Sequence, residues 1–231
     1  MKKKQQSPMK FAVIMTVVVV FLIGALIVIN NQTKNASQTF DDKPSTEGQP
    51  ILGNKSAAVT ITEFGDYKCP SCKQWTENVF PDLKKDYIDK GKVNFSYINF
   101  VNEQHGRGSE LSALASEQVW KEDPDSYWAF HEALYKAQPD NDTMESEWAT
   151  PAKLADITES HTKVKRDKLI KSLSDKTFSK ELGTDESLIN EYKVNSTPTI
   201  FVNGEKIAEP FNYDKIKEAI EKELKGKSNE K

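Results

Sequence analysis

Residues 58–72 read AVTITEFGDYKCPSC and place two cysteines directly after an apolar run. The β-branched residues at positions 59–62 favour extended backbone, so residues 58–64 are expected to form a strand. A four-residue loop, 65–68, then leads to Cys69-Pro70-Ser71-Cys72. From residue 70 to about residue 90 apolar side chains recur at helical spacing, and proline is well tolerated in a first helical turn. The stretch therefore predicts a strand, a loop and a helix that begins at the cysteine pair.

The flanking sequence continues the alternation of strand and helix. Pro81 lies inside the predicted helix, where a kink is expected, and Gly91 ends it. A second strand is predicted over 93–101, and helical patterns dominate 106–192. The remaining elements are a strand at 199–202, a tight turn at Asn203-Gly204, a returning strand at 205–208 and a helix at 213–224. This order predicts an α/β fold with one central mixed sheet flanked by helices, and a helical insertion that caps one end.

The only cysteines, Cys69 and Cys72, allow three interpretations. A stabilising disulfide is the first, but closing so short a loop removes little unfolded-state entropy, roughly 2 kcal/mol. A metal site is the second, but the three histidines lack a paired-ligand spacing: His105, His131 and His161. The third, a redox-active pair, is favoured.

A redox pair has a physical basis at a helix N-terminus. The first turn presents unpaired N–H groups and the positive end of the helix dipole, and both stabilise a thiolate. Thiol pKa values in such places fall to roughly 3.5–7.5. Lys68 adds a neighbouring cation. Cys72 lies one turn further along and is expected to be more buried, so we expect Cys69 to exchange with substrate and Cys72 to resolve the mixed disulfide.

Glu63 lies six residues before Cys69, on the same face of the predicted strand as Val59 and Ile61. If that face is buried, Glu63 is expected to accept the proton of Cys72. The alternative is an exposed acid at the end of a strand, because acids are rarely fully buried.

A second feature lies far downstream, where Thr197-Pro198 directly precedes a predicted strand. Proline at a strand start is uncommon unless its peptide bond is cis or the edge is special. A cis bond would turn the backbone of Thr197 outward to pair with an incoming peptide. An ordinary trans turn is the alternative.

Composition excludes several classes of protein. The chain has 231 residues, a formal net charge of −3 and a mean hydropathy of −0.65. After residue 50 the balance is 26 basic to 32 acidic side chains, which argues against nucleic acid as the main partner. Two cysteines exclude a disulfide-stapled miniprotein and a four-cysteine zinc site. A hydrophobic content of 37% excludes a multi-span membrane protein.

The first 50 residues predict an anchor and a tether. Four lysines precede an uncharged run at 11–29, whose length as a helix, about 28 Å, approaches the ~30 Å hydrocarbon core. A cleaved signal peptide is the alternative, but its apolar region is shorter and ends in a small-x-small site. The basic flank, 1–10, is expected to stay in the cytoplasm. Residues 30–50 are polar and are expected to form a flexible spacer, unless Gln49 and Pro50 pack onto the domain.

The Cys69-Pro70-Ser71-Cys72 motif, the helical insertion and the Thr197-Pro198 hairpin together resemble the DsbA-like thiol–disulfide oxidoreductases of the thioredoxin superfamily. The resemblance covers residues 50–226, and the anchor and spacer resemble the membrane-tethered Gram-positive members. It implies a thioredoxin fold built from 51–104 and 193–226, with a helical insertion at 105–192. It further implies that Cys69 is the nucleophile, Cys72 the resolving thiol, Glu63 a buried acid and Pro198 a cis proline.

One position departs from the family pattern. Ser71 stands where the Gram-negative oxidase carries histidine. The dipeptide Pro70-Ser71 between the cysteines helps to set thiolate stability, so the strength of this chain as an oxidant is left open.

The expected function is that of an extracytoplasmic thiol oxidase, held at the cell membrane by a single span, that introduces disulfide bonds into secreted or surface proteins. The resemblance implies reoxidation by a membrane quinone-linked thiol oxidoreductase, and no cofactor beyond the redox-active disulfide. A thiol reductase or disulfide isomerase is the alternative, because direction depends on the potential difference between the cysteine pair and its partners. A peptide-binding module without redox activity is disfavoured by the cysteine pair.

Two acidic clusters bear on metal binding: Glu122, Asp123 and Asp125, and Asp140, Asp142 and Glu145. Neither matches the ligand spacing of an EF-hand loop. The ordinary interpretation is solvated acidic surface, since exposed acids are the norm. A structural calcium site outside the cell is the alternative.

Overall fold

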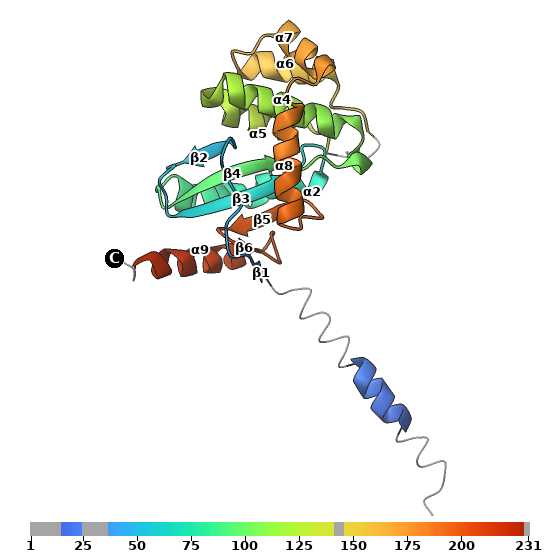
Figure 1. Ribbon diagram of the computed structural model, residues 1–231, viewed down its shortest axis with the longest axis vertical. Helices are drawn as coiled ribbons and strands as arrows, with labels where there is room; N and C mark the ends of the chain where they lie inside the picture. Colours follow the sequence, from blue (N-terminus) through green and yellow to red (C-terminus); the bar gives the residue numbers. More distant parts are fainter. Residues whose placement is uncertain (1–14, 25–36, 141–145, 229–231) are drawn as a thin grey trace, which may run out of the picture. The chain divides into compact units, whose positions relative to one another are not determined.

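The computed structural model describes residues 15–24, 37–140 and 146–228 (Figure 1). The chain divides into two units, 1–37 and 38–231. In the first unit, residues 15–24 are helical. Among the described residues, no helix combines the length and the apolar character needed to cross a membrane. The predicted tail at 1–10, and positions 11–14 and 25–29 of the predicted anchor, lie outside the described residues, so the anchor stays a prediction.

The second unit is built on a six-stranded sheet with the order β1-β6-β5-β3-β4-β2. β3 and β4 are parallel, and every other pair of neighbours is antiparallel. The central strand β3 therefore hydrogen-bonds to β4 on one side and to β5 on the other. The strands are β1 (Gln38–Thr39), β2 (Ile51–Gly53), β3 (Val59–Gly65), β4 (Val93–Asn99), β5 (Thr199–Val202) and β6 (Glu205–Lys206).

The helix after β3 is interrupted where a kink was predicted. α2 (Pro70–Asn78) ends at Val79, and α3 (Phe80–Leu83) follows directly. Pro81 has no N–H to continue the ladder of α2, which explains the break. The last turn, Lys84–Ile88, is a wider π-helical turn.

Five further α-helices of the described residues lie between β4 and β5 in the chain, where the helical insertion was predicted. Figure 1 shows α4, α5, α6 and α7 gathered at the opposite end of this unit from α9. The helix α4 contacts the four helices that follow it, α8 contacts β4, and α9 packs against β3 and β5. The helices are α4 (Arg107–Glu122), α5 (Tyr127–Ala137), α6 (Pro151–His161), α7 (Arg166–Asp175), α8 (Ser179–Glu191) and α9 (Tyr213–Ser228), with short 3-10 turns at Glu103–His105 and Pro124–Ser126.

The two faces of the sheet bury separate apolar clusters, because side chains alternate along each strand. Val59 and Ile61 of β3 belong to the larger cluster, which extends through α2, α9 and the helical insertion. Phe64 belongs to the smaller one, with Leu188 of α8 and Phe201 of β5. All seven residues of β3 are buried, so the strand that delivers the cysteine loop lies at the centre of the fold.

The prediction of a flexible spacer at 30–50 is wrong from residue 38 onward. β1 pairs with β6, and the Phe40 ring lies 5.1 Å from that of Tyr192 between centroids. Gln49 is buried, and its Nε2 donates to Asp185 Oδ1 at 2.6 Å. A strand can join a sheet through main-chain groups alone, so a polar composition did not exclude this pairing. Residues 30–36 lie outside the described residues.

Candidate active site

Cys69 is the N-cap residue of α2, with extended backbone (φ −79°, ψ 116°), and Pro70 takes the first helical position. The main-chain N–H of Cys69 donates to the carbonyl oxygen of Asp66 at 2.9 Å, which closes the turn before the helix. The Sγ atom of Cys69 then lies within hydrogen-bonding range of the main-chain N–H groups of Ser71 and Cys72. These are N–H groups that a helix start leaves without a partner inside the helix.

The two thiols are free and differ in exposure and acidity. Cys69 is 6% exposed and Cys72 is fully buried. The pKa of Cys69 falls to about 6, because it accepts hydrogen bonds from the Cys72 thiol and, more weakly, from Thr197 and the N–H groups of the helix start; burial opposes the shift. Burial raises the pKa of Cys72 well above its ordinary value, and its bond to Cys69 adds to this. Cys69 is therefore the thiolate and Cys72 the protonated thiol near neutral pH.

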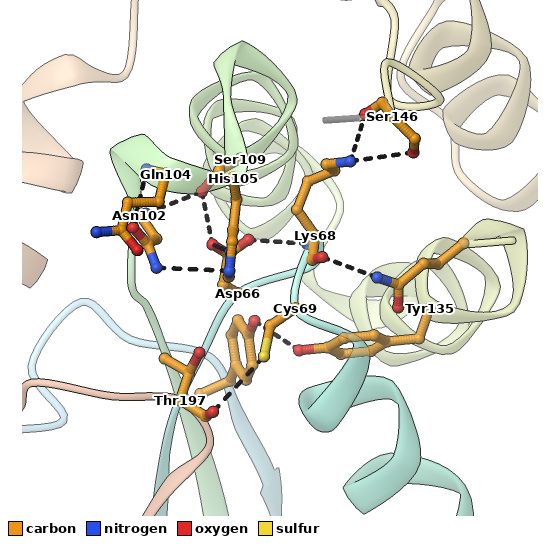
Figure 2. A network of polar contacts seen from close by, with 12 residues as sticks. Asp66, Lys68, Cys69, Asn102, Gln104, His105, Ser109, Tyr135, Ser146 and Thr197 are labelled. Carbon is orange, nitrogen blue, oxygen red and sulfur yellow. Dashed lines mark hydrogen bonds and ion pairs between the residues drawn. The ribbon is translucent and has the colours of Figure 1, made fainter. Parts of the chain in front are cut away.

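The segment before β5 completes the surface around Cys69. The Thr197–Pro198 peptide bond is cis. The Sγ of Cys69 lies 3.5 Å from the main-chain oxygen of Thr197 (Figure 2). The predicted cis proline is thus present, beside the nucleophile.

Glu63 lies in the middle of β3 and is fully buried, so the alternative of an exposed acid is wrong. Neither carboxyl oxygen has a hydrogen-bond partner among the described residues. Burial raises the pKa of this carboxyl well above its ordinary value, and the charge of Cys69 raises it further. Glu63 can therefore hold a proton at pH values where surface acids have lost theirs.

Tyrosines form the wall around the buried acid and thiol. The hydroxyls of Tyr97 and Tyr135 are hydrogen-bonded at 2.9 Å, and Tyr67 packs on both rings. Burial raises the pKa of all three hydroxyls, so they stay neutral and add no charge that would compete with the thiolate.

The ammonium of Lys68, predicted as a cation beside Cys69, is bound by another segment of the chain. Figure 2 shows its side chain directed at Ser146, where Nζ donates to the main-chain oxygen and to Oγ. The Lys68 side chain is buried, and its main-chain oxygen accepts a hydrogen bond from Gln138 Nε2 at 2.9 Å. Lys68 therefore ties the cysteine loop to the segment after α5, and the main causes that lower the pKa of Cys69 are its hydrogen bonds.

Sequence reasoning missed a polar network that holds the same loop from the other side. Asp66 Oδ2 lies 2.6 Å from His105 Nδ1 and accepts from Ser109 Oγ at 2.8 Å (Figure 2). Asp66 Oδ1 accepts from the main-chain N–H of Lys68 at 2.8 Å. Asp66 was visible as an acid in the loop before the motif, but no spacing in the sequence connects it to His105.

The acidic clusters proposed for calcium are only partly described. Asp123 accepts from the main-chain N–H of Lys163 and lies 3.5 Å from Lys163 Nζ, and Asp140 pairs with Lys73 at 2.7 Å. Asp142 and Glu145 lie outside the described residues. Over the described ranges, no group of three or more His, Cys, Asp or Glu side chains converges as metal ligands would.

Comparisons with known proteins agree with this geometry. The family model described as thioredoxin matches residues 45–222. Disulfide bond formation protein D of Bacillus subtilis (strain 168) is 52% identical over 198 residues, which cover 86% of this chain and 87% of the relative. The crystal structure of oxidised BdbD from Bacillus subtilis matches with a TM-score of 0.77 at 49% identity, covering 81% of this chain and 99% of that chain. The crystal structure of Chlamydia trachomatis DsbA matches with a TM-score of 0.65 at 26% identity, covering 75% and 90%.

The matched region contains the central strand, the cysteine pair, the whole helical insertion and the cis-proline hairpin. A buried thiol, a thiolate at a helix start and a cis proline beside it form a complete dithiol site, and the relative at 52% identity is a disulfide bond formation protein. On these grounds the chain belongs to the thioredoxin family, as a thiol–disulfide oxidoreductase that introduces disulfide bonds.

Proposed function

We propose that this enzyme oxidises secreted or surface proteins on the extracytoplasmic side of the membrane, with Cys69 as the exchanging sulfur. The observation that carries the proposal is the contrast between the two thiols: the pKa of Cys69 is lowered to about 6 while that of Cys72 is raised. Interactions that stabilise the thiolate stabilise only the reduced form, because the sulfur atoms of the disulfide carry no charge. A couple whose reduced form is stabilised has a higher potential and passes its disulfide on.

The exchange proceeds in two balanced steps. A substrate thiolate attacks Sγ of Cys69, the Cys69–Cys72 bond breaks, and the departing sulfur of Cys72 takes a proton from Glu63. A second substrate thiolate then attacks the substrate sulfur of the mixed disulfide, and Cys69 leaves as the thiolate. The substrate dithiol loses two electrons to the cysteine pair and becomes a disulfide.

The carboxyl of Glu63 reverses its role when the enzyme is reoxidised. Cys72 must then lose its proton to attack the mixed disulfide on Cys69, and Glu63 is the buried acid beside the pair. Its raised pKa is suited to both duties, since a group that gives and takes a proton works best near the ambient pH. The proposed reoxidant is a membrane quinone-linked thiol oxidoreductase, which the anchor predicted at 11–29 would keep within reach.

The redox equilibrium with glutathione tests the direction of the reaction. An oxidase should be more than half reduced in a glutathione buffer set at an extracytoplasmic poise, and its oxidised form should transfer a disulfide to a reduced, unfolded secreted protein. A chain that stays oxidised in that buffer, and reduces disulfides in the transfer assay, is a reductase.

We further propose that a structural calcium ion, which the sequence analysis gave as an alternative, binds at a buried carboxyl pair, Glu117 and Asp185. Asn99 Nδ2 contacts both carboxyls, Glu117 Oε1 at 2.6 Å and Asp185 Oδ2 at 3.1 Å. The amide oxygens of Asn99 and Gln49 are buried beside the pair with no partner among the described residues. Which way an amide points is assigned from its hydrogen bonds, and turning both over would complete an all-oxygen set suited to a hard cation.

The charges at this pair favour a cation. Burial raises the pKa of Glu117, and the neighbouring charge of Asp185 raises it further. A bound divalent ion would remove that repulsion. Calcium titration followed by thermal melting tests the proposal, with magnesium as the comparison ion. Calcium should raise the melting temperature of the wild-type chain, and Glu117→Gln, which lacks one of the proposed ligands, should lose this response. A melting temperature that calcium leaves unchanged removes the proposal.

A further inference from the structure

Asp66 links the cysteine loop to the helical insertion at several points. Its carboxylate accepts hydrogen bonds from Ser109 at the start of α4, from His105 just before α4, and from the main chain of Lys68. Its own main-chain oxygen accepts the N–H of Cys69 at 2.9 Å. The side chains of His105 and Asp66 are 5% and 1% exposed. One buried side chain therefore connects His105 to the turn that positions the nucleophile.

The second nitrogen of His105 is the one that titrates. A carboxylate only accepts, so the proton on Nδ1 is held against Asp66 in both charge states. Nε2 lies 3.4 Å from Asn102 Nδ2, a long contact, and His105 lines a cavity of about 390 Å³ between the start of α4 and the segment 146–151. A proton can therefore enter or leave at Nε2 without breaking the bond to Asp66.

The charge of His105 is coupled to that of Cys69. The bond to Asp66 is the main cause that raises the pKa of His105, and the negative charge of the Cys69 thiolate raises it further. Coupling between two titrating groups is mutual, so the imidazolium must stabilise the thiolate to the same extent. A disulfide has no such charge, so the imidazolium is favoured more in the reduced enzyme than in the oxidised one.

We propose that His105 is a positioning residue of the dithiol site: through Asp66 it holds the loop before Cys69, and its imidazolium stabilises the reduced enzyme, so that the oxidising strength increases when His105 is protonated. The inference rests on the proposed function in one respect, since it takes Cys69 as the exchanging thiolate. It adds a proton to the redox reaction: reduction of the disulfide by two electrons is accompanied by proton uptake at His105.

Several other charges face His105 and set its titration. Lys68, in the cysteine loop, opposes protonation, and Asp66 and the Cys69 thiolate favour it. Glu103 and Arg107 flank His105 on its own segment, and Glu147 lines the same cavity from the segment before α6. The attraction of Asp66 outweighs the rest because it acts through a direct hydrogen bond of 2.6 Å.

The first test follows the histidine itself in the full chain. Proton–nitrogen NMR of the histidine rings, recorded across pH 5–9 in the oxidised and the reduced protein, gives the pKa of His105 in each state. We expect a higher pKa of His105 in the reduced protein, and the ring signals of His161, whose Nδ1 bonds the Ile157 carbonyl of its own helix, serve as the reference. Equal His105 pKa values in the two redox states overturn the proposal, and this result needs no variant to fold.

The second test separates charge from structure. His105→Gln should lower the equilibrium constant for reduction by glutathione about fivefold at pH 6.5, and this deficit should shrink as the pH rises and wild-type His105 loses its proton. Ser109→Ala removes another bond to Asp66 without a change of charge. Any change that it causes in the equilibrium constant should therefore be independent of pH. If the deficit of His105→Gln is also independent of pH, His105 only supports the loop and the proposal fails. The wild-type constant is measured in the same series and tests the proposed oxidase separately.

Discussion

The Sγ of Cys69 lies 3.5 Å from the main-chain oxygen of Thr197, although the two residues are 128 positions apart in the chain. The sheet brings them together, because β3 and β5 are antiparallel neighbours and Phe64 at the end of β3 pairs with Thr199 at the start of β5. The loop that leaves β3 and the turn that enters β5 therefore meet at one edge of the sheet. The reacting sulfur and the main chain that precedes β5 are therefore parts of one site.

The Cys72→Ala variant should accumulate mixed disulfides with reduced substrate proteins. It keeps the exchanging sulfur of Cys69, with its bonds at the helix start, but lacks the thiol that would release the substrate. Cys69→Ala should trap none, because the remaining thiol is fully buried and its pKa is raised. Non-reducing electrophoresis after acid quenching measures both, and equal trapping by the two variants would mean that the assigned roles are wrong.

The Glu63→Gln variant should slow both steps that move a proton at Cys72, the attack of substrate on the Cys69–Cys72 disulfide and the resolution of mixed disulfides by Cys72, by about 10²-fold, as expected for the loss of a general acid–base group. Its free energy of unfolding at neutral pH should rise by about 1–3 kcal/mol, because the variant removes the cost of ionising a fully buried carboxyl. The raised pKa of Glu63 predicts that this stability gain is present at neutral pH and disappears below the ordinary carboxyl pKa.

Single-turnover kinetics by stopped-flow fluorescence and urea unfolding at pH 7 and pH 4 measure these effects. Glu77→Gln is the matched control, since that side chain is half exposed on α2. A resolution rate that Glu63→Gln leaves unchanged assigns proton transfer to another group.

The stability of the reduced form relative to the oxidised form should rise with pH. The pKa of Cys69 is lowered from 9.0 to about 6, and a lowered pKa adds stability that is complete above the unfolded pKa and lost as the pH falls through the folded one. Between about pH 6 and pH 9 the reduced form should therefore gain about 1.4 kcal/mol per pH unit. The raised pKa of Cys72 opposes this only above pH 9.

A disulfide across four residues stabilises the oxidised form by roughly 2 kcal/mol. The gain of the reduced form with pH should exceed this amount above about pH 7.5, where the reduced form becomes the more stable one. Denaturant unfolding of both forms at pH 6, 7, 8 and 9 measures the crossing. An oxidised form that remains clearly more stable throughout contradicts the proposed oxidase and favours a reductase.

A chain that begins at Gly53 should be less stable than one that begins at Gln38 by about 3 kcal/mol or more. The shorter chain lacks β1, most of β2, the ring of Phe40 and the buried bond from Gln49 to Asp185. Thermal melting of the two chains under identical conditions provides the comparison. Equal melting temperatures would show that residues 38–52 add nothing to the folded domain.

Local sequence was sufficient to predict the dithiol chemistry and the order of the strands and helices. The strand, the cysteine pair at a helix start and the break near Pro81 depend on neighbouring residues, which act through backbone preference and helix termini. The predicted strand at 199–202 and the turn after it agree with β5 and the β5–β6 hairpin for the same reason. The N-terminal anchor was equally a local prediction, and it stays one.

Tertiary structure decided which charges act on the dithiol. Lys68 is adjacent to Cys69 in sequence but its ammonium is bound by Ser146, while His105, 39 positions from Asp66, holds the cysteine loop. The polar sequence of residues 38–50 predicts a linker, but strand pairing uses main-chain groups that every sequence has. Local sequence therefore determined that two thiols meet a helix start, and only the packed fold, which selects the buried charges by distance and removes water around them, decided their acidity.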